Sequence, residues 1–383
     1  MRKICVVLTA RTSYTKIKPI LISLRKEKFV ELQLVLAASA VLEKYGNTDK
    51  MVVNDGFKIN EKVYMTIESE SLLNSAKSTG LGIIEFSGAF NRLKPDLVMV
   101  MADRFEVISA AISAAYQNIP LAHIQGGEVS GNIDEKVRHA ITKLADFHFP
   151  ATLRAKEWII KMGENPDNVF FTGCPSTDIA KKVINKPDLN FDLYEKYGGV
   201  GSFPNLKNRY IVVMQHPVTT EHDKAEKQIE ETLNAIKNIN KSVIWFWPNP
   251  DAGGDSTSKA IRRFREQNNP KHLHFIKNMD PEDFLRLVYN SDGIVGNSSC
   301  AIRECSFLGI PAVNIGTRQS NRERSPNVVD VDYDRMSINK AINDHCNGKV
   351  KGVTLYGDGT AGEKIAKICS KIQLSFSKSI NYL

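Results

Sequence analysis

The stretch Ala122-His-Ile-Gln-Gly-Gly-Glu-Val-Ser-Gly-Asn-Ile-Asp-Glu-Lys-Val-Arg-His139 places polar and ionisable residues between two segments that are typical of a buried core. An apolar strand pattern, residues 119–124, leads into it, and a helical pattern follows it at residues 133–144. Open α/β sheets bind ligands where a strand ends and a loop leads into a helix. The stretch therefore predicts a strand, a helix and a binding site between them.

The helical spacing sets two acid–base pairs side by side near this loop. Asp134 stands four residues before Arg138, and Glu135 stands four residues before His139, so each pair shares a helix face. A capped helix with ordinary surface ion pairs would show the same spacing. The loop itself carries Glu128, and the end of the preceding strand is also ionisable, which favours a site.

Apolar runs alternate with helical patterns on both sides of the stretch. The run at residues 96–101 is typical of a buried strand and brings Asp103 and Arg104 to its carboxyl end. A second alternating series begins with the apolar run that ends at His216. Such alternation predicts an α/β fold with two Rossmann-like, doubly wound domains.

Length agrees with two domains, because 383 residues exceed what one hydrophobic core usually serves. Glycine and proline gather in the middle of the chain, as in a connection between domains. The expected division is an N-terminal Rossmann-like domain over 1–177, a connection over 178–208, a C-terminal nucleotide-binding Rossmann-like domain over 209–361, and a final helix, about 362–383, that packs back on the first domain.

Composition and charge limit the classes of binding partner that we expect. The net charge is +8 and the pI is near 9.0, but the basic residues are dispersed, without a basic block interleaved with aromatics, so we expect no nucleic-acid partner. An anionic small molecule suits this charge. The six cysteines form no Cys-x-x-Cys pair, which is typical of reduced thiols and favours the cytoplasm. No apolar run is long enough to predict a membrane span.

Basic residues also flank the first predicted turn. Arg11 and Lys16 follow the apolar strand at residues 4–8, a good position for an anion at a helix start. They would equally suit a solvated turn. Because proline is best tolerated in the first turn of a helix, Pro19 predicts that this helix begins near Ile17.

The second half of the chain offers a matching anion site. Gly296-Asn-Ser-Ser-Cys-Ala-Ile-Arg-Glu304 joins a strand to a helix, so backbone N–H groups with the Ser298 and Ser299 hydroxyls could hold a diphosphate. An ordinary serine N-cap is the alternative. Arg318 leaves the next strand end beside it, and His216 leaves another.

Cofactor motifs are missing from the sequence. The histidines lack the spacing of metal ligands, and the chain contains neither a Gly-x-Gly-x-x-Gly fingerprint nor a Walker lysine loop. We therefore expect no metal, no nicotinamide cofactor and no ATP chemistry.

Blocks along the whole chain resemble the hydrolysing UDP-N-acetylglucosamine 2-epimerases of sialic-acid and related nonulosonic-acid biosynthesis. The matching blocks are Thr-Ser-Tyr-Thr-Lys16 after Arg11, Ala-Asp-Arg-Phe-Glu106, His-Ile-Gln-Gly-Gly-Glu-Val-Ser-Gly131, Ile-Asp-Glu-Lys-Val-Arg-His-Ala-Ile-Thr-Lys143, Pro-Asn-Pro-Asp-Ala-Gly253, Gly-Asn-Ser-Ser-Cys300 with Arg303 and Glu304, and Gly-Thr-Arg-Gln319. Three positions depart from the family pattern: glutamate is found at Gln125 in part of the family, and glycine is common at Ala102 and Ala10.

The resemblance implies a GT-B arrangement with the active site in the interdomain cleft. It implies conversion of UDP-GlcNAc, or a close nucleotide-HexNAc analogue, and water into ManNAc and UDP through a glycal, without a cofactor, in a cytoplasmic dimer or tetramer. We expect Asp103, Asp134, His216 and Glu128 to act in catalysis. By the same resemblance, the substrate would be bound by Arg11, Lys16, Arg104, Phe284 (packing on the base), Ser298, Ser299, Glu304 and Arg318.

Three other functions remain open from the sequence. A GT-B glycosyltransferase would use the same fold with an acceptor, and a non-hydrolysing epimerase would leave its product on UDP. A catalytically silent nucleotide-sugar sensor would bind without turnover. The nucleotide could also be GDP, and the sugar a diacetamido analogue.

Overall fold

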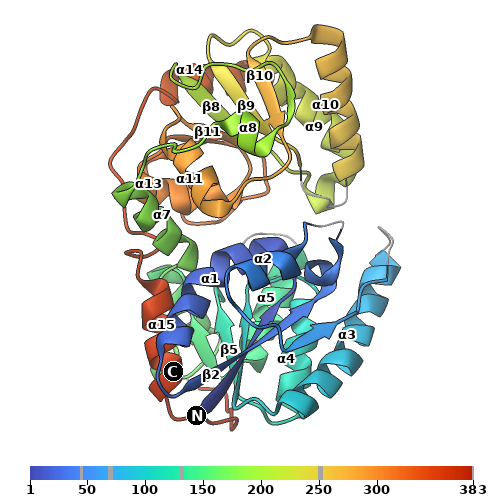
Figure 1. Cartoon of the computed structure of the whole chain (residues 1–383), viewed down its shortest axis with the longest axis vertical. Coiled ribbons are helices and arrows are strands. Elements are labelled where there is room, and N and C mark those ends of the chain that lie inside the picture. Colours follow the sequence, from blue (N-terminus) through green and yellow to red (C-terminus); the bar gives the residue numbers. More distant parts are fainter. Residues whose placement is uncertain (44–45, 68–71, 130–132, 249–252, 382–383) are drawn as a thin grey trace. The chain divides into compact units, whose positions relative to one another are not determined.

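The computed structural model describes residues 1–43, 46–67, 72–129, 133–248 and 253–381 (Figure 1). The chain divides into two compact units. Unit 1 comprises Met1–Val129, Ile133–Asp178 and Gly357–Leu383, and unit 2 comprises Ile179–Tyr356. The carboxyl-terminal segment thus belongs to the unit that the chain builds first.

Unit 1 is built on a parallel sheet in the order β3-β2-β1-β4-β5-β6. Its strands are β1 (Arg2–Leu8), β2 (Val30–Ala37), β3 (Glu61–Val63), β4 (Leu97–Met101), β5 (Leu121–Ile124) and β6 (Phe147–Phe149). The strand order reverses between β1 and β4, and this reversal is where Rossmann-type sheets bind ligands.

Helices cover both faces of this sheet. They are α1 (Arg11–Lys26), α2 (Thr48–Asn54), α3 (Leu72–Leu93), α4 (Val107–Tyr116), α5 (Ile133–Leu144), α6 (Leu153–Lys161) and α15 (Ala361–Lys371), while α7 (Pro175–Asn185) continues the chain into unit 2. One core cluster lies under α1 and α15 and another under α3 and α4. Strands buried on both faces explain the continuous apolar runs of the sequence.

Helix α1 begins at Arg11, six residues earlier than Pro19 led us to expect. Pro19 lies inside the helix, where it removes one backbone hydrogen bond. The first turns are held by tertiary contacts, because the buried Tyr14 hydroxyl donates to Asp55, and the Lys18 ammonium contacts the same carboxylate at 2.6 Å. Packing thus outweighs the local cost of proline.

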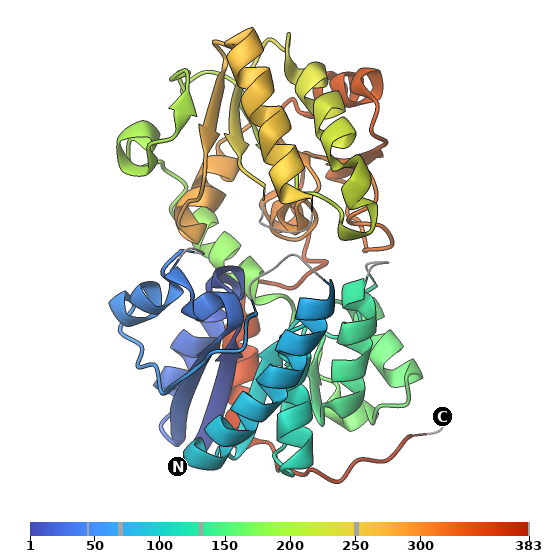
Figure 2. The ribbon, with the colours of Figure 1, turned by 90° about the vertical axis from the view of Figure 1, so that its right-hand side faces the viewer.

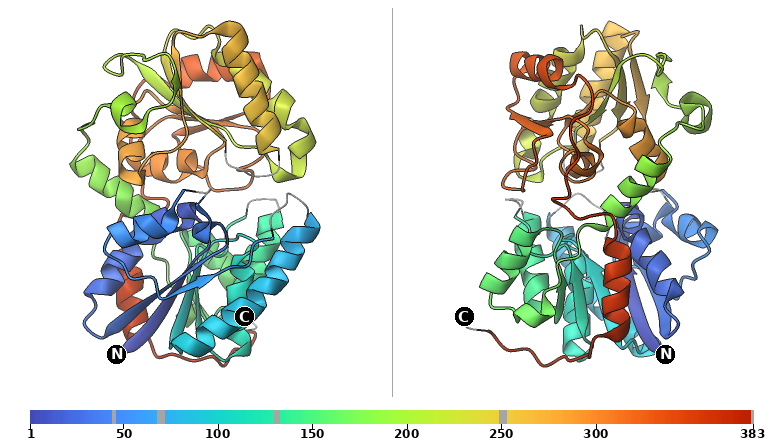
Figure 3. Two further views of the ribbon diagram at one scale, coloured as in Figure 1. Left: turned by 45° about the vertical axis from the view of Figure 1, so that its right-hand side comes forward. Right: turned by 90° about the vertical axis from the view of Figure 1, so that its left-hand side faces the viewer.

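Helix α15 packs beside α1, and the chain then runs along unit 1 as far as residue 381 (Figures 1 and 3). A Cβ on Gly362 would lie 2.7 Å from the Pro19 carbonyl, so only glycine permits this close approach. Farther on, the Lys378 ammonium contacts Glu164 at 2.6 Å and donates to the carbonyl of Thr142 at 3.1 Å. The tail is therefore part of the unit 1 fold.

Unit 2 repeats the plan with a sheet in the order β13-β12-β11-β8-β9-β10-β7, in which only β7 is antiparallel to its neighbour among the described strands. The strands are β7 (Val200–Gly201), β8 (Tyr210–Met214), β9 (Ser242–Phe246), β10 (Leu273–Ile276), β11 (Ile294–Gly296), β12 (Ala312–Ile315) and β13 (Val328–Val331). Here the order reverses between β8 and β11.

Helices α9 and α10 lie side by side on one face of this sheet (Figure 2). The helices of unit 2 are α8 (Leu193–Tyr197), the 3-10 helix η4 (Thr219–Lys224), α9 (Ala225–Ile236), α10 (Gly254–Asn268), α11 (Pro281–Tyr289), α12 (Ser299–Ile302), α13 (Glu304–Leu308) and α14 (Arg335–His345). The predicted α/β class with two Rossmann-like sheets is confirmed. Within the described residues, no helix has the length and apolar character needed to cross a membrane.

Candidate active site

In unit 1, candidate residues follow three neighbouring strands. Arg11 opens α1 just after β1, Asp103 and Arg104 follow β4, and Glu128 follows β5. Since β1, β4 and β5 are adjacent and parallel, their carboxyl ends meet at one edge of the sheet. Arg11, Asp103 and Arg104 therefore lie at the strand ends where the order reverses, and Glu128 follows the next strand.

Arg138 of α5 links two of these strand ends. Its side chain is only 2% exposed, and its guanidinium forms an ion pair with the carboxylate of Asp103. The same guanidinium donates a 2.6 Å hydrogen bond to the backbone carbonyl of Glu128. The Asp103 side chain is 18% exposed and thus stays reachable from solvent.

A second buried side chain supports the residue before Asp103. Ala102 adopts a left-handed backbone conformation with φ of 66°, and Nε2 of His123 lies 2.9 Å from its carbonyl oxygen. Nδ1 of His123 contacts the Thr142 hydroxyl at 3.1 Å. Burial lowers the pKa of His123 to about 3, so this imidazole is neutral and Nε2 donates to Ala102. His123 is structural support.

The basic candidates of unit 1 differ in their surroundings. Arg104 is oriented by a 2.7 Å ion pair with Glu106, whose side chain is buried. Arg11 packs over Gly46, so that a Cβ there would meet the guanidinium at 3.0 Å. Lys16 lies one turn into α1 and is half-buried. Described contacts therefore hold the guanidinium groups of Arg104 and Arg11.

The predicted acid–base pairs on α5 have different outcomes. His139 does contact Glu135, at 3.4 Å. Asp134 lies in the first turn of α5, but its side chain is outside the part that the structure describes, as are loop residues 130–132 and turn residues 249–252. Arg138 forms an ion pair with Asp103.

Gln125 also has a left-handed backbone, with φ of 63°. Its side-chain amide donates to the Cys174 sulfur at 3.0 Å, and that sulfur lies 2.9 Å from the Ser176 hydroxyl. All three side chains are buried. A thiol contact therefore holds the residue that replaces the glutamate of part of the family.

In unit 2, Asn297 holds the backbone of His216. The His216 N–H donates to Oδ1 of Asn297 at 2.7 Å, and Nδ2 of Asn297 donates to the His216 carbonyl at 2.8 Å. His216 follows β8 and Asn297 follows β11, so the clamp spans the reversal of strand order.

Arg318 and Gln319 join the same cluster from the end of β12. Both side chains donate to the carbonyl of Asn297, at 3.2 and 2.9 Å. Burial, and then the positive charge of Arg318, hold the pKa of His216 well below its usual range. His216 is therefore a neutral imidazole next to a cation.

The remaining candidates surround this cluster or lie on α11. Ser298 is the N-cap of α12, and its hydroxyl oxygen accepts from the Cys300 N–H at 3.3 Å, so the serine-cap alternative is also realised. Ser299 begins the helix. Glu304 is 6% exposed, and its Oε2 has no hydrogen-bond partner in the described part of unit 2. Phe284 packs edge-on against Phe246 with centroids 5.2 Å apart.

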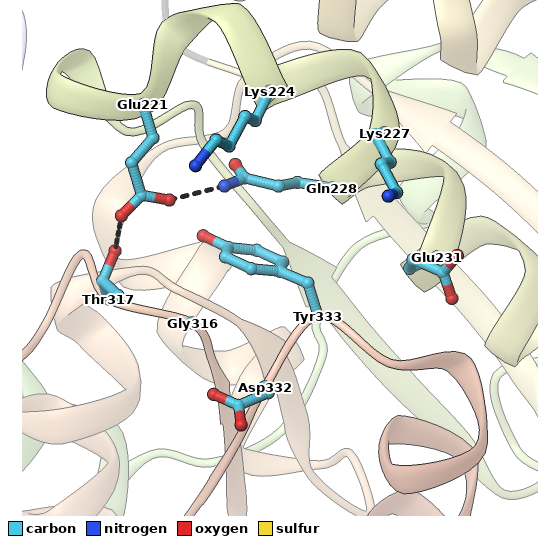
Figure 4. A pocket seen from close by; sticks show the side chains of 9 residues that line it. All are labelled: Glu221, Lys224, Lys227, Gln228, Glu231, Gly316, Thr317, Asp332 and Tyr333. Carbon is cyan, nitrogen blue, oxygen red and sulfur yellow. Dashed lines mark hydrogen bonds between the residues drawn. The ribbon is translucent and has the colours of Figure 1, made fainter.

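A cavity of about 380 Å³ lies beside Gly316 and Thr317, the two residues that follow β12 (Figure 4). Its lining is Glu221, Lys224, Lys227, Gln228, Glu231, Gly316, Thr317, Asp332 and Tyr333. Glu221 accepts a hydrogen bond from Thr317 and another, of 2.6 Å, from Gln228. Glu221 thus ties the segment after β12 to the helices that follow His216.

Sequence reasoning did not assign roles to two buried side chains, Arg138 and Asn297. Arg138 was noted only as a helical neighbour of Asp134, and Asn297 as part of the glycine–serine turn. An arginine amid the apolar positions of α5 was a usable signal, because arginine is rarely buried without a partner. Asn297 carried no comparable signal.

A family model described as UDP-N-acetylglucosamine 2-epimerase matches residues 22–370. The chain belongs to this family. Among curated members, it is 32% identical to the UDP-N,N'-diacetylbacillosamine 2-epimerase (hydrolyzing) of Legionella pneumophila, over 98% of this chain and 97% of the relative. It is 33% identical to polysialic acid biosynthesis protein P7 of Escherichia coli, over 90% and 86% of the two chains.

Solved structures of UDP-N-acetylglucosamine 2-epimerases share the fold. The Neisseria meningitidis enzyme bound to UDP-GlcNAc aligns with a TM-score of 0.80 at 18% identity, covering 96% of this chain and 99% of that one. The Methanocaldococcus jannaschii enzyme in complex with UDP-GlcNAc and UDP gives 0.79 at 19% identity, with the same coverages. The epimerase fold therefore extends over almost the whole chain.

Proposed function

We propose that this epimerase is hydrolysing and converts UDP-GlcNAc, or a close nucleotide-HexNAc analogue, and water into ManNAc and UDP. The observation that carries the proposal is the partly exposed Asp103 carboxylate, fixed by a buried arginine at the switch point of a family member. Relatives from Legionella and Campylobacter jejuni carry "hydrolyzing" in their names.

The reaction balances without a cofactor. A carboxylate removes the proton at C2 while the bond from C1 to the UDP oxygen breaks, which leaves a glycal with a C1–C2 double bond. Water then adds its hydroxyl to C1, and a proton is delivered to C2 on the face that gives the manno configuration. Carboxylates are suited to both proton transfers when the fold fixes their geometry.

We assign the roles as follows. Asp103 and Asp134 exchange the protons, Glu128 is a further catalytic carboxylate, and the neutral His216 acts as a hydrogen-bond partner or acid–base group. Arg318, Ser298, Ser299, Arg11, Lys16 and Arg104 bind phosphates or sugar. The buried Oε2 of Glu304 can accept a hydrogen bond from a ribose hydroxyl, and Phe284 packs on the base.

A second substrate is supported by the Legionella and Campylobacter relatives, whose names specify N,N'-diacetylbacillosamine on UDP or on GDP or UDP. The chemistry at C1 and C2 would be the same, because the sugars differ away from those atoms. We therefore propose one reaction for both sugars, and the experiment below determines which sugar is the substrate. We also propose a cytoplasmic homo-oligomer, by analogy with the family.

The test is turnover in D2O followed by NMR, with UDP-GlcNAc, GDP-GlcNAc and UDP-N,N'-diacetylbacillosamine in parallel. We expect a free 2-epimerised sugar with one deuterium at C2, together with nucleoside diphosphate. A product still attached to the nucleotide would identify a non-hydrolysing epimerase. Free sugar that retains hydrogen at C2 would show direct hydrolysis instead of elimination. Binding without turnover would indicate a sensor.

A further inference from the structure

Arg138 is a charged side chain in an environment that ordinarily excludes charge. It is 1% exposed as a residue, and burying an ionised group is costly unless it is paired and hydrogen-bonded. Its partners are the Asp103 carboxylate and the Glu128 carbonyl. The buried guanidinium therefore links α5 to two strand-end loops.

The guanidinium has the shape for this task. It is planar and presents several N–H donors in a rigid fork, whereas a lysine ammonium would act as a single flexible point charge. The NH1 group serves the loop after β5, and the NH2 group serves the carboxylate after β4. One side chain therefore fixes the position of Asp103 relative to the loop that carries Glu128.

We propose that Arg138 is a positioning residue of the epimerase reaction, acting through Asp103. This inference rests on the proposed function, in which Asp103 transfers a proton. Arg138 holds the carboxylate in one orientation while leaving its exposed side, 18% of the side-chain surface, open to the sugar. Misplacing a reacting group by about 1 Å can lower a rate by about a hundredfold.

The first experiment is a double-mutant cycle of Asp103→Asn and Arg138→Met, with kcat and KM measured for each variant. We expect Arg138→Met to lower kcat by about a hundredfold with KM changed by less than about threefold, the pattern of a lost transition-state interaction. In the Asp103→Asn background, Arg138→Met should lower kcat no further, since residues that act as a unit are not additive.

Folding must be separated from positioning. Arg138→Met leaves the partly exposed Asp103 carboxylate and the Glu128 carbonyl without this partner, so this variant is the one at risk of unfolding. The double variant removes both charges and should unfold at a higher temperature than Arg138→Met alone. Arg138→Lys retains a cation and should fold, yet recover less than about a tenth of the wild-type kcat because it lacks the fork.

Chemical rescue distinguishes a positioning role from a purely structural one, because only a positioning role predicts that added guanidinium ion restores activity. We expect guanidinium ion, at concentrations of tens of millimolar that leave the protein folded, to raise the kcat of Arg138→Ala several-fold and to leave Asp103→Asn unchanged. Arg92→Met is the matched control, because Arg92 pairs with Glu61 on the surface of unit 1 and should retain full activity.

The outcomes separate the two proposals. Equal losses for Arg138→Met in the wild-type and Asp103→Asn backgrounds would overturn the positioning role while leaving the epimerase function intact. Full activity of Arg138→Lys would overturn it as well. Wild-type turnover by Asp103→Asn would instead remove Asp103 from the mechanism, and with it both the assigned role and this inference.

Discussion

The side chain of Asn297 forms two hydrogen bonds with the backbone of His216, accepting from its N–H at 2.7 Å and donating to its carbonyl at 2.8 Å. A side chain that follows β11 thus holds the backbone of the second residue after the neighbouring strand, β8. The Asn297 side-chain amide holds the backbone of His216, and the Asn297 backbone carbonyl accepts a hydrogen bond from Arg318. The geometry around the imidazole should therefore respond to Asn297 directly.

Replacing Asn297 by alanine leaves a buried donor and a buried acceptor on His216 without partners. Each such group costs about 1–3 kcal/mol, so we expect urea unfolding to show a clear loss of stability. Activity should fall in the surviving folded protein. Asn208→Ala, which removes an exposed asparagine of the same unit, is the control and should change stability by less than about 0.5 kcal/mol. Equal stability of the two variants would contradict the clamp.

Ala102→Gly tests the strained turn before Asp103. A non-glycine residue at a positive φ costs about 1–3 kcal/mol, and glycine removes most of that cost while adding unfolded-state entropy. We expect a change between neutral and about 1 kcal/mol of stabilisation. Ala110→Gly, in the middle of α4, should destabilise by about 1 kcal/mol. Equal losses in thermal unfolding would show that φ at residue 102 carries no strain.

The sequence predicted the sheets well because strands buried on both faces leave unbroken apolar runs, as at residues 97–101. It failed where distant contacts decide the outcome. The start of α1 depends on Tyr14 reaching Asp55, which no local pattern around Pro19 reveals. Strand β13 was missed because it is short and at the sheet edge, with two of its four residues exposed.

The candidate site divides in the same way. Asp103 was found because strand ends bind ligands, a rule that needs only the order of elements. The contact of Arg138 with Asp103 was not predicted, since helical periodicity reports neighbours along α5 and says nothing about the loop after β4. Identifying such tertiary pairs requires the fold itself.

Acid should destabilise unit 1 through His123. Its pKa is lowered by burial from 6.5 to about 3, so the unfolded chain binds this proton first as the pH falls. The stabilisation is complete above pH 6.5 and is lost as the pH falls toward 3, at up to about 1.4 kcal/mol per pH unit. Urea titrations at pH 7, 6, 5 and 4 give the free energy of unfolding as a function of pH. For His123→Gln, this free energy should fall with pH less steeply than for the wild type, by about that amount per pH unit. Parallel curves for the two proteins would contradict the shifted pKa.

The carboxyl-terminal tail should stabilise unit 1 through Lys378. Burial by itself raises the pKa of Glu164, but hydrogen bonds from His148, Lys143 and Lys378 outweigh it and bring the pKa to about 2. Lys378→Met removes one charged donor, a loss of at most about 1.5–3 kcal/mol at pH 7, because burial lowers the pKa of Lys378 and so offsets part of the gain from its charge. The loss should shrink as the pH falls from 4.5 toward 2, where Glu164 takes up a proton. Lys371→Met, at the end of α15, is the control.

Glu221 should control nucleotide affinity without touching the nucleotide. Its carboxylate accepts from Thr317, the residue before Arg318, and from Gln228 of α9. Without the Glu221 carboxylate, Thr317 loses this hydrogen bond, and ordering residues 316–318 then becomes part of the cost of binding a diphosphate.

We expect Arg318→Ala to weaken UDP binding roughly 10- to 150-fold, the scale of a lost charged hydrogen bond, and Glu221→Ala to weaken it by less. The two effects should not add, because the second acts through the first. Calorimetric titration of UDP into the two single variants and the double variant checks this, with Glu226→Ala, an exposed acid paired with Arg263, as the control. Additive losses would place Glu221 in a separate role, and unchanged affinity in Arg318→Ala would remove that arginine from the nucleotide site.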